Sequence, residues 1–148
     1  MRLHHDAKID RLKEIPLFKN ATKEGLVHLA QAADEIDVRA GTQIIAQGQH
    51  NREASIIVSG SVKVVVDGEH VATIPAGEIV GELGLFGLGP STATVTAAED
   101  VTLLTIPYNR FDQILDDNPS MGVELARELA GRLFKMDVHH GEHARATE

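Results

Sequence analysis

The middle of the chain, residues 35–106, carries short apolar runs with a period of two, and this pattern limits the possible fold more than any other feature. The runs are EIDVRA, TQIIAQ, ASIIVSG, SVKVVV, HVATIP, ATVTAAE and VTLLTIP, and Gly, Pro, Asn or Asp separates them. Asp67-Gly68 predicts a tight hairpin turn, because Gly accepts the positive φ that such turns need. Seven or eight short strands at this spacing predict a sandwich, barrel or jelly roll.

Helical periodicity lies on both sides of this region. Thr22 opens a helix after a first apolar stripe, and Phe111 and Ile114 line another short helix near the far end. A long amphipathic helix follows the break at Asn118-Pro119-Ser120. We therefore predict a single α+β domain over residues 1–148. A β-roll (a jelly-roll-like antiparallel barrel) at about 35–106 is flanked by N-terminal helices at about 6–33 and C-terminal helices at about 109–138, the last being a lid helix, and a polar tail follows.

Composition excludes several classes of protein. The net charge is −8 and the pI is near 5.4, which disfavours a nucleic-acid-binding surface. The chain has no cysteine, so disulfides, thiolate metal sites and a cysteine nucleophile are excluded. The N-terminus lacks the apolar segment of a signal peptide, and no apolar run is long enough for a membrane-spanning helix. We expect a cytoplasmic domain that contacts neither membrane nor DNA.

The stretch GELGLFGLGPSTATVTA, residues 81–97, is typical of a loop that holds a phosphate. Its glycines expose the backbone, and its single acid is followed by the start of a short helix, where N–H groups lack partners and can bind an anion. The stretch contains neither lysine nor arginine. The backbone itself would therefore have to supply the donors.

These motifs and their order resemble the cyclic nucleotide-binding domain of the catabolite activator protein and of the regulatory subunit of cAMP-dependent protein kinase. The resemblance runs from about residue 12 to 136. It rests on IPLF at 15–18, IIAQG at 44–48, IIVSGSVKV at 56–64, GEIVGELGLF at 77–86 and ATVTA at 93–97. It implies cAMP or cGMP as the ligand, backbone donors from residues 81–84, and a contact from Glu82 to the ribose 2′-OH.

The resemblance also implies an arginine beneath the phosphate, and this sequence has Ser91 at that position. Losing a charge-assisted contact weakens binding by about ten- to two-hundred-fold. The hydroxyls of Ser91 and Thr92 would offset part of this loss, and Arg52, Arg127 or Arg132 would be substitute cations. The residues expected to bind the cyclic nucleotide are Gly81, Glu82, Leu83, Gly84, Ser91, Thr92, Arg132 and Met136.

Two functions remain open. The first is a non-enzymatic cyclic nucleotide sensor in signal transduction that acts through movement of its C-terminal helix. The second is an interaction or dimerisation module that binds the nucleotide weakly or not at all. Leu125, Leu129, Leu133 and Met136 are the candidate seam of a homodimer, and a further protein partner is unidentified. The chain ends soon after the lid helix, so we expect no helix-turn-helix. No catalytic motif or His/Glu metal spacing is present, so we expect no enzyme, metal or cofactor.

Overall fold

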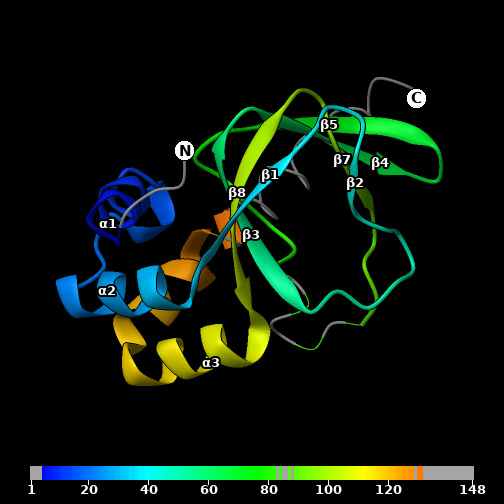
Figure 1. Cartoon of the computed structure of the whole chain (residues 1–148). Coiled ribbons are helices and arrows are strands. Elements are labelled where there is room, and N and C mark those ends of the chain that lie inside the picture. Colours follow the sequence, from blue (N-terminus) through cyan, green and yellow to red (C-terminus); the bar gives the residue numbers. More distant parts are fainter. Residues whose placement is uncertain (1–4, 83, 85–86, 88, 129, 132–148) are drawn as a thin grey trace.

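The helices of the protein gather at one end of a β-roll (Figure 1). The computed structural model describes residues 5–128 apart from 83, 85, 86 and 88, together with residues 130 and 131. The helical elements are α1 (His5–Lys13), the 3-10 turn η1 (Pro16–Phe18), α2 (Lys23–Ala32), α3 (Tyr108–Asp117) and residues 119–128. The strands are β1 (Asp34–Val38), β2 (Gln43–Ile45), β3 (Glu53–Ser59), β4 (Ser61–Val66), β5 (Glu69–Pro75), β6 (Ile79–Val80), β7 (Thr94–Ala97) and β8 (Val101–Pro107).

The strands form two antiparallel sheets, ordered β1-β8-β3-β6 and β2-β7-β4-β5. This arrangement confirms the predicted α+β class with a β-roll and flanking helices. The hairpin between β4 and β5 turns at Asp67 and Gly68, whose φ angles are 53° and 82°, so the predicted tight turn is also confirmed. Strand β6 was not predicted as a separate run, because two residues carry no visible period.

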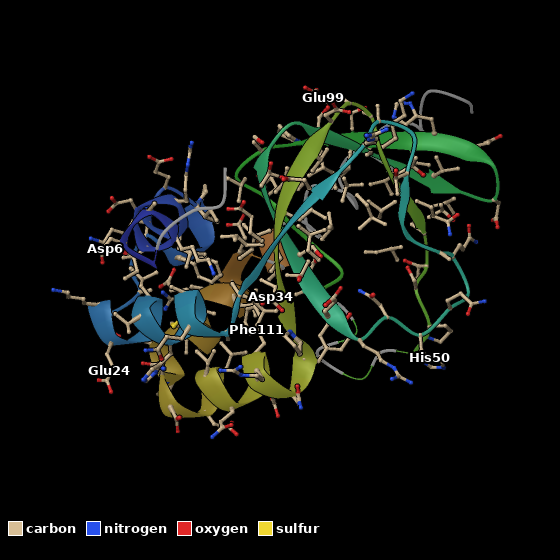
Figure 2. All side chains as sticks on the ribbon, viewed as in Figure 1. Asp6, Glu24, Asp34, His50, Glu99 and Phe111 are labelled. Atoms are coloured by element: carbon tan, nitrogen blue, oxygen red, sulfur yellow. The ribbon has the colours of Figure 1, made fainter. Side chains whose placement is uncertain are left out.

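Strands β3 and β8 are buried on both faces. Ile56 and Leu104 pack in a core cluster with the helices, whereas their neighbours Ile57 and Leu103 pack in a second cluster between the two sheets. Side chains alternate across a strand, so adjacent buried residues require cover on both sides. Figure 2 places Phe111 inside the helical end, where its side chain is fully buried. The central strand pair therefore joins two hydrophobic cores.

The helix ends follow local chemistry. Thr22 caps α2, as predicted, because its Oγ1 accepts from the N–H of Gly25 at 3.0 Å. Asn118 ends α3 and donates from Nδ2 to the carbonyl of Ile114 at 2.8 Å. A helix then begins at residue 119, as predicted. Within the described residues, no helix has the length and apolar character needed to cross a membrane.

The described part of this last helix packs in the helical core. Met121 and Leu125 are 3% and 1% exposed, and a Cβ added at Gly25 of α2 would lie 2.6 Å from the sulfur of Met121. Leu125 was expected on a dimer seam; instead it is buried within its own chain. The side chain of Leu129, and Leu133 with the rest of the expected lid, lie outside the described residues.

Replacing either neighbour on β3 with alanine tests the two-sided burial. We expect Ile56→Ala and Ile57→Ala each to lower the free energy of unfolding by about 2–5 kcal/mol, because each leaves a cavity in a different core. Val71→Ala on β5, where the side chain is 57% exposed, is the control and should change it by less than about 0.5 kcal/mol. Urea unfolding measures all three. A small cost at one of the two isoleucines would contradict burial on both faces.

Candidate functional site

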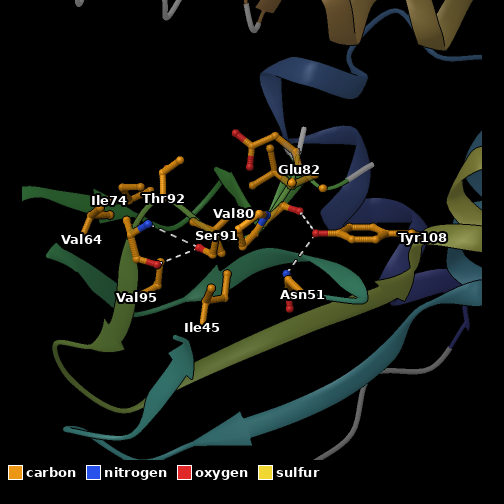
Figure 3. A pocket seen from close by; sticks show the side chains of 16 residues that line it. Ile45, Asn51, Val64, Ile74, Val80, Glu82, Ser91, Thr92, Val95 and Tyr108 are labelled. Atoms are coloured by element: carbon orange, nitrogen blue, oxygen red, sulfur yellow. Dashed lines mark hydrogen bonds between the residues drawn. The ribbon is translucent and has the colours of Figure 1, made fainter. Parts of the chain in front are cut away.

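A cavity of about 320 Å³ lies between the second sheet and the turn that follows β6. This volume is within the range of small-molecule sites. Val64, Ile74 and Val95 lie at one end of it, and Tyr108 with Asn51 lies at the other (Figure 3). The lining residues are Ile45, Asn51, Val64, Ile74, Ile79, Val80, Gly81, Glu82, Gly84, Gly89, Pro90, Ser91, Thr92, Ala93, Val95 and Tyr108.

The lining combines an apolar floor with a few polar groups. Most of the large side chains are Ile or Val, and the ionisable groups among the lining residues are the carboxyl of Glu82 and the phenol of Tyr108. None of these sixteen lining residues is Lys, Arg or His. Within the part of the chain that the structure describes, the donors open to an anion at this site would belong to the backbone and to hydroxyl groups.

The side chains of Tyr108 and Asn51 support the turn after β6. The hydroxyl of Tyr108, the first residue of α3, donates to the carbonyl of Gly81. Nδ2 of Asn51 donates to this hydroxyl at 3.1 Å and to the carbonyl of Glu53 at 2.6 Å. Three segments far apart in the sequence therefore meet at one phenol (Figure 3).

Glycine is required in this turn because the backbone lies directly on these side chains. Gly81 has φ +78°, and a Cβ there would lie 2.6 Å from Nδ2 of Asn51. A Cβ at Gly84 would lie 2.5 Å from the hydroxyl of Tyr108. Any side chain at either position would push the turn away from its support.

Ser91 uses its polar groups inside the fold. Its carbonyl accepts from the N–H of Gly48 and its N–H donates to the carbonyl of Gln49, both at 2.8 Å. Its hydroxyl donates to the carbonyl of Ala93 at 2.7 Å and accepts from the N–H of Ala93 at 3.4 Å. The hydroxyl proton that was expected to offset the missing arginine is thus given to the backbone of its own turn. Thr92 beside it is exposed and also lines the cavity.

The structure brings together most of the predicted site. The predicted residues that line this cavity are Gly81, Glu82, Gly84, Ser91 and Thr92. Leu83, Arg132 and Met136 lie outside the described residues. Among the other proposed cations, Arg52 does not line the cavity and Arg127 pairs with Glu124 at 3.0 Å on an exposed helix face. No three His, Asp or Glu side chains within the described part of the chain gather closely enough to hold a metal ion.

The sequence prediction missed Asn51 and Tyr108. Neither belongs to a glycine-rich motif, and their partners lie 57 and 27 residues away along the chain. The available signal was composition, since Tyr108 is the single tyrosine of a chain without tryptophan. A lone tyrosine at the end of a strand carries a polar group that needs a partner when it is buried.

Burial raises the pKa of the Tyr108 phenol above its ordinary value, and this is the largest effect on it. The hydrogen bond from Asn51 acts in the opposite direction, because it stabilises the phenolate. The negative charges of Glu82 and then Glu53 raise the pKa again. Tyr108 is therefore a neutral donor to Gly81 around neutral pH.

Comparisons with known proteins agree with the observed fold. Residues 35–118 match the model of the cyclic nucleotide-binding domain family. The CRP-like cAMP-activated global transcriptional regulator of Mycobacterium tuberculosis is 28% identical over 122 residues, which cover 79% of this chain and 54% of the regulator. The cAMP-dependent protein kinase regulatory subunit of Yarrowia lipolytica is 31% identical over 106 residues, which cover 70% of this chain and 28% of the subunit.

A solved structure also matches. The catabolite activator protein of Thermus thermophilus superposes with a TM-score of 0.78 at 25% identity, over 87% of this chain and 63% of that protein. The chain thus spans about half the length of the mycobacterial relative and less than a third of the yeast one.

The absorbance of tyrosinate measures the environment of Tyr108 directly, because the chain has no other tyrosine. We expect a titration midpoint above about 10, the ordinary value for tyrosine. Glu82→Gln should lower the midpoint by removing a negative charge, and Asn51→Ala should raise it by removing the donor. The stabilisation from neutral Tyr108 is complete below the unfolded pKa and is lost as pH rises through the folded pKa. A wild-type midpoint at or below 10 would contradict the burial of the phenol.

Proposed function

The chain belongs to the cyclic nucleotide-binding domain family, and on this premise we propose that it is a non-enzymatic regulatory domain that binds cAMP or cGMP in the cavity beside the Gly81 turn. The observation that carries the proposal is the meeting of two separate segments at one cavity. Gly81, Glu82 and Gly84 come from the turn after β6, and Ser91 and Thr92 come from the approach to β7. Both halves of the expected phosphate and ribose site thus line the same space.

Each group has a role in this proposal. Backbone N–H groups of the Gly81 turn donate to the cyclic phosphate, the role that the family resemblance implies for residues 81–84. The carboxylate of Glu82 accepts from the ribose 2′-OH, and Thr92 donates to a phosphate oxygen. The apolar floor, with Val64 and Ile74, contacts the sugar and base. Leu83, Arg132 and Met136 belong to the proposed site through the family resemblance.

The expected affinity is low for this kind of pocket. The cavity has no guanidinium among its described lining residues, and the Ser91 hydroxyl is bonded to Ala93. A neutral hydrogen bond contributes about half as much as a charge-assisted one. The ligand's negative charge would also approach a chain whose net charge is −8.

The regulatory step would pass through α3. Tyr108 is bonded to the turn through its hydroxyl and begins α3, and the helix from residue 119 follows the end of α3 at Asn118. A ligand that favours one position of the turn would therefore favour one position of these helices. The named relatives support this reading, since one is a cAMP-activated transcriptional regulator and another a kinase regulatory subunit. Movement of the C-terminal helix would change a dimer or partner contact.

One observation favours a second function. The position of the family's arginine holds a serine whose hydroxyl completes its own turn. This is what a fold retained as an interaction or dimerisation module, without a cyclic nucleotide, would contain.

Titration calorimetry with cAMP and cGMP distinguishes the two functions. We expect Ser91→Arg to strengthen binding by about ten- to two-hundred-fold, since it restores a charge-assisted contact. Glu82→Gln should weaken binding by about tenfold or more, through loss of a charged acceptor. Glu24→Gln, at an exposed position of α2, changes the net charge by the same amount and should leave the affinity unchanged. If neither wild type nor Ser91→Arg binds at millimolar ligand, the sensor is excluded and the interaction module remains.

A further inference from the structure

We propose that Tyr108 is a positioning residue of the site: its hydroxyl, oriented by Asn51, fixes the carbonyl of Gly81 and with it the turn that carries Glu82 and Gly84 along the cavity. The inference rests on the proposed function, because it concerns the same cavity. It assigns a role to a side chain that lies outside the glycine-rich motif.

The hydrogen-bond directions at Tyr108 are determined by their neighbours. Asn51 faces the carbonyl of Glu53 at 2.6 Å, and a carbonyl only accepts, so the donor there is Nδ2 of Asn51. The second proton of this amide is directed at the Tyr108 hydroxyl at 3.1 Å. The hydroxyl therefore accepts from Asn51, and its single proton is donated to the carbonyl of Gly81. No alternative pairing satisfies both carbonyls.

This bond sets the direction of a backbone donor. The carbonyl of Gly81 and the N–H of Glu82 belong to one planar trans peptide, so they point in opposite directions. Because the carbonyl is held toward Tyr108, the N–H of Glu82 is held away from it. The phenol thus fixes the orientation of this peptide, although Tyr108 belongs to a different segment of the chain.

Tyr108 and Asn51 also limit how closely the backbone of the turn can approach them. Cβ atoms added at Gly84 and Gly81 would lie 2.5 Å from the Tyr108 hydroxyl and 2.6 Å from Nδ2 of Asn51. The turn therefore rests on the two side chains at two points. Tyr108 is itself anchored, since its N–H donates to the carbonyl of Arg52 at 2.9 Å in the loop that carries Asn51. Binding by a turn depends on how its groups are oriented, so the support that Tyr108 and Asn51 give to the turn affects the affinity.

The variant that isolates this bond is Tyr108→Phe, which removes the hydroxyl and keeps the ring. The matched control is Thr105→Val on β8. Thr105 is a buried residue whose hydroxyl bonds the carbonyl of Asp34 at 3.5 Å, and it does not line the cavity. Both variants lose one hydroxyl of a buried or half-buried residue near the end of the same strand. Asn51→Ala is the second test variant if Tyr108→Phe does not fold.

The first measurement needs no ligand. We expect the ¹⁵N order parameters of the Gly81, Glu82 and Gly84 amides to fall in Tyr108→Phe and to keep their wild-type values in Thr105→Val. Calorimetry in wild type and in the Ser91→Arg background is the second measurement. Tyr108→Phe should weaken cAMP or cGMP binding by about five- to tenfold, the effect of one hydrogen bond, whereas Thr105→Val should not.

Negative results in the two measurements contradict different claims. Unchanged order parameters in Tyr108→Phe, or an equal change in Thr105→Val, would overturn the positioning role whatever binds. Unchanged affinity in Tyr108→Phe, in a background that binds, would also overturn it. If no background binds a cyclic nucleotide, the proposed function fails, and the order parameters alone decide whether Tyr108 positions the turn.

Discussion

The burial of β3 and β8 on both faces is the constraint that determines where the site lies. One face of this strand pair carries the helical core and the other carries the core between the sheets. The Gly81 turn and its support at Tyr108 are both attached to these strands. Strand β6 pairs with β3 through Ser55 and Val80 and leads directly into Gly81, and β8 ends at Pro107, immediately before Tyr108. The position of the turn relative to its phenol support is thus set by two cores rather than by the loop itself.

The chemistry of the cavity differs from that of a pocket built around a cation. Its described lining carries the Thr92 hydroxyl and one carboxylate over an apolar floor, together with the backbone of the Gly81 turn. Such a site depends on preorganisation, because a neutral donor contributes only when it is already aimed at its acceptor. The bonds among Asn51, Tyr108 and Gly81 provide that preorganisation. In the proposed function, these bonds would hold the backbone of the loop in place for an anion although the loop has neither arginine nor lysine.

Most of the fold was predictable from periodicity and turn chemistry, since the hairpin at Asp67 and the cap at Thr22 depend on residues close in sequence. The glycine-rich motif also predicted which two segments meet at the cavity. The support of the turn was not predictable, because Tyr108 and its partners are brought together by the sheets alone. Nor did the sequence reveal that Ser91 donates to Ala93, since a serine hydroxyl bonds its own turn or a ligand equally well.

The most direct test of the account is a titration of the ¹⁵N-labelled chain with cAMP, followed through its amide resonances. The account predicts that the largest shifts occur at Glu82, Gly84 and Thr92, with a smaller response at the start of α3. Shifts that are absent at millimolar cAMP, and absent again in the same titration with cGMP, would contradict it. Shifts that are largest in the polar groove between α2 and α3, where Arg110 lies with His28 and Gln31, would contradict it equally.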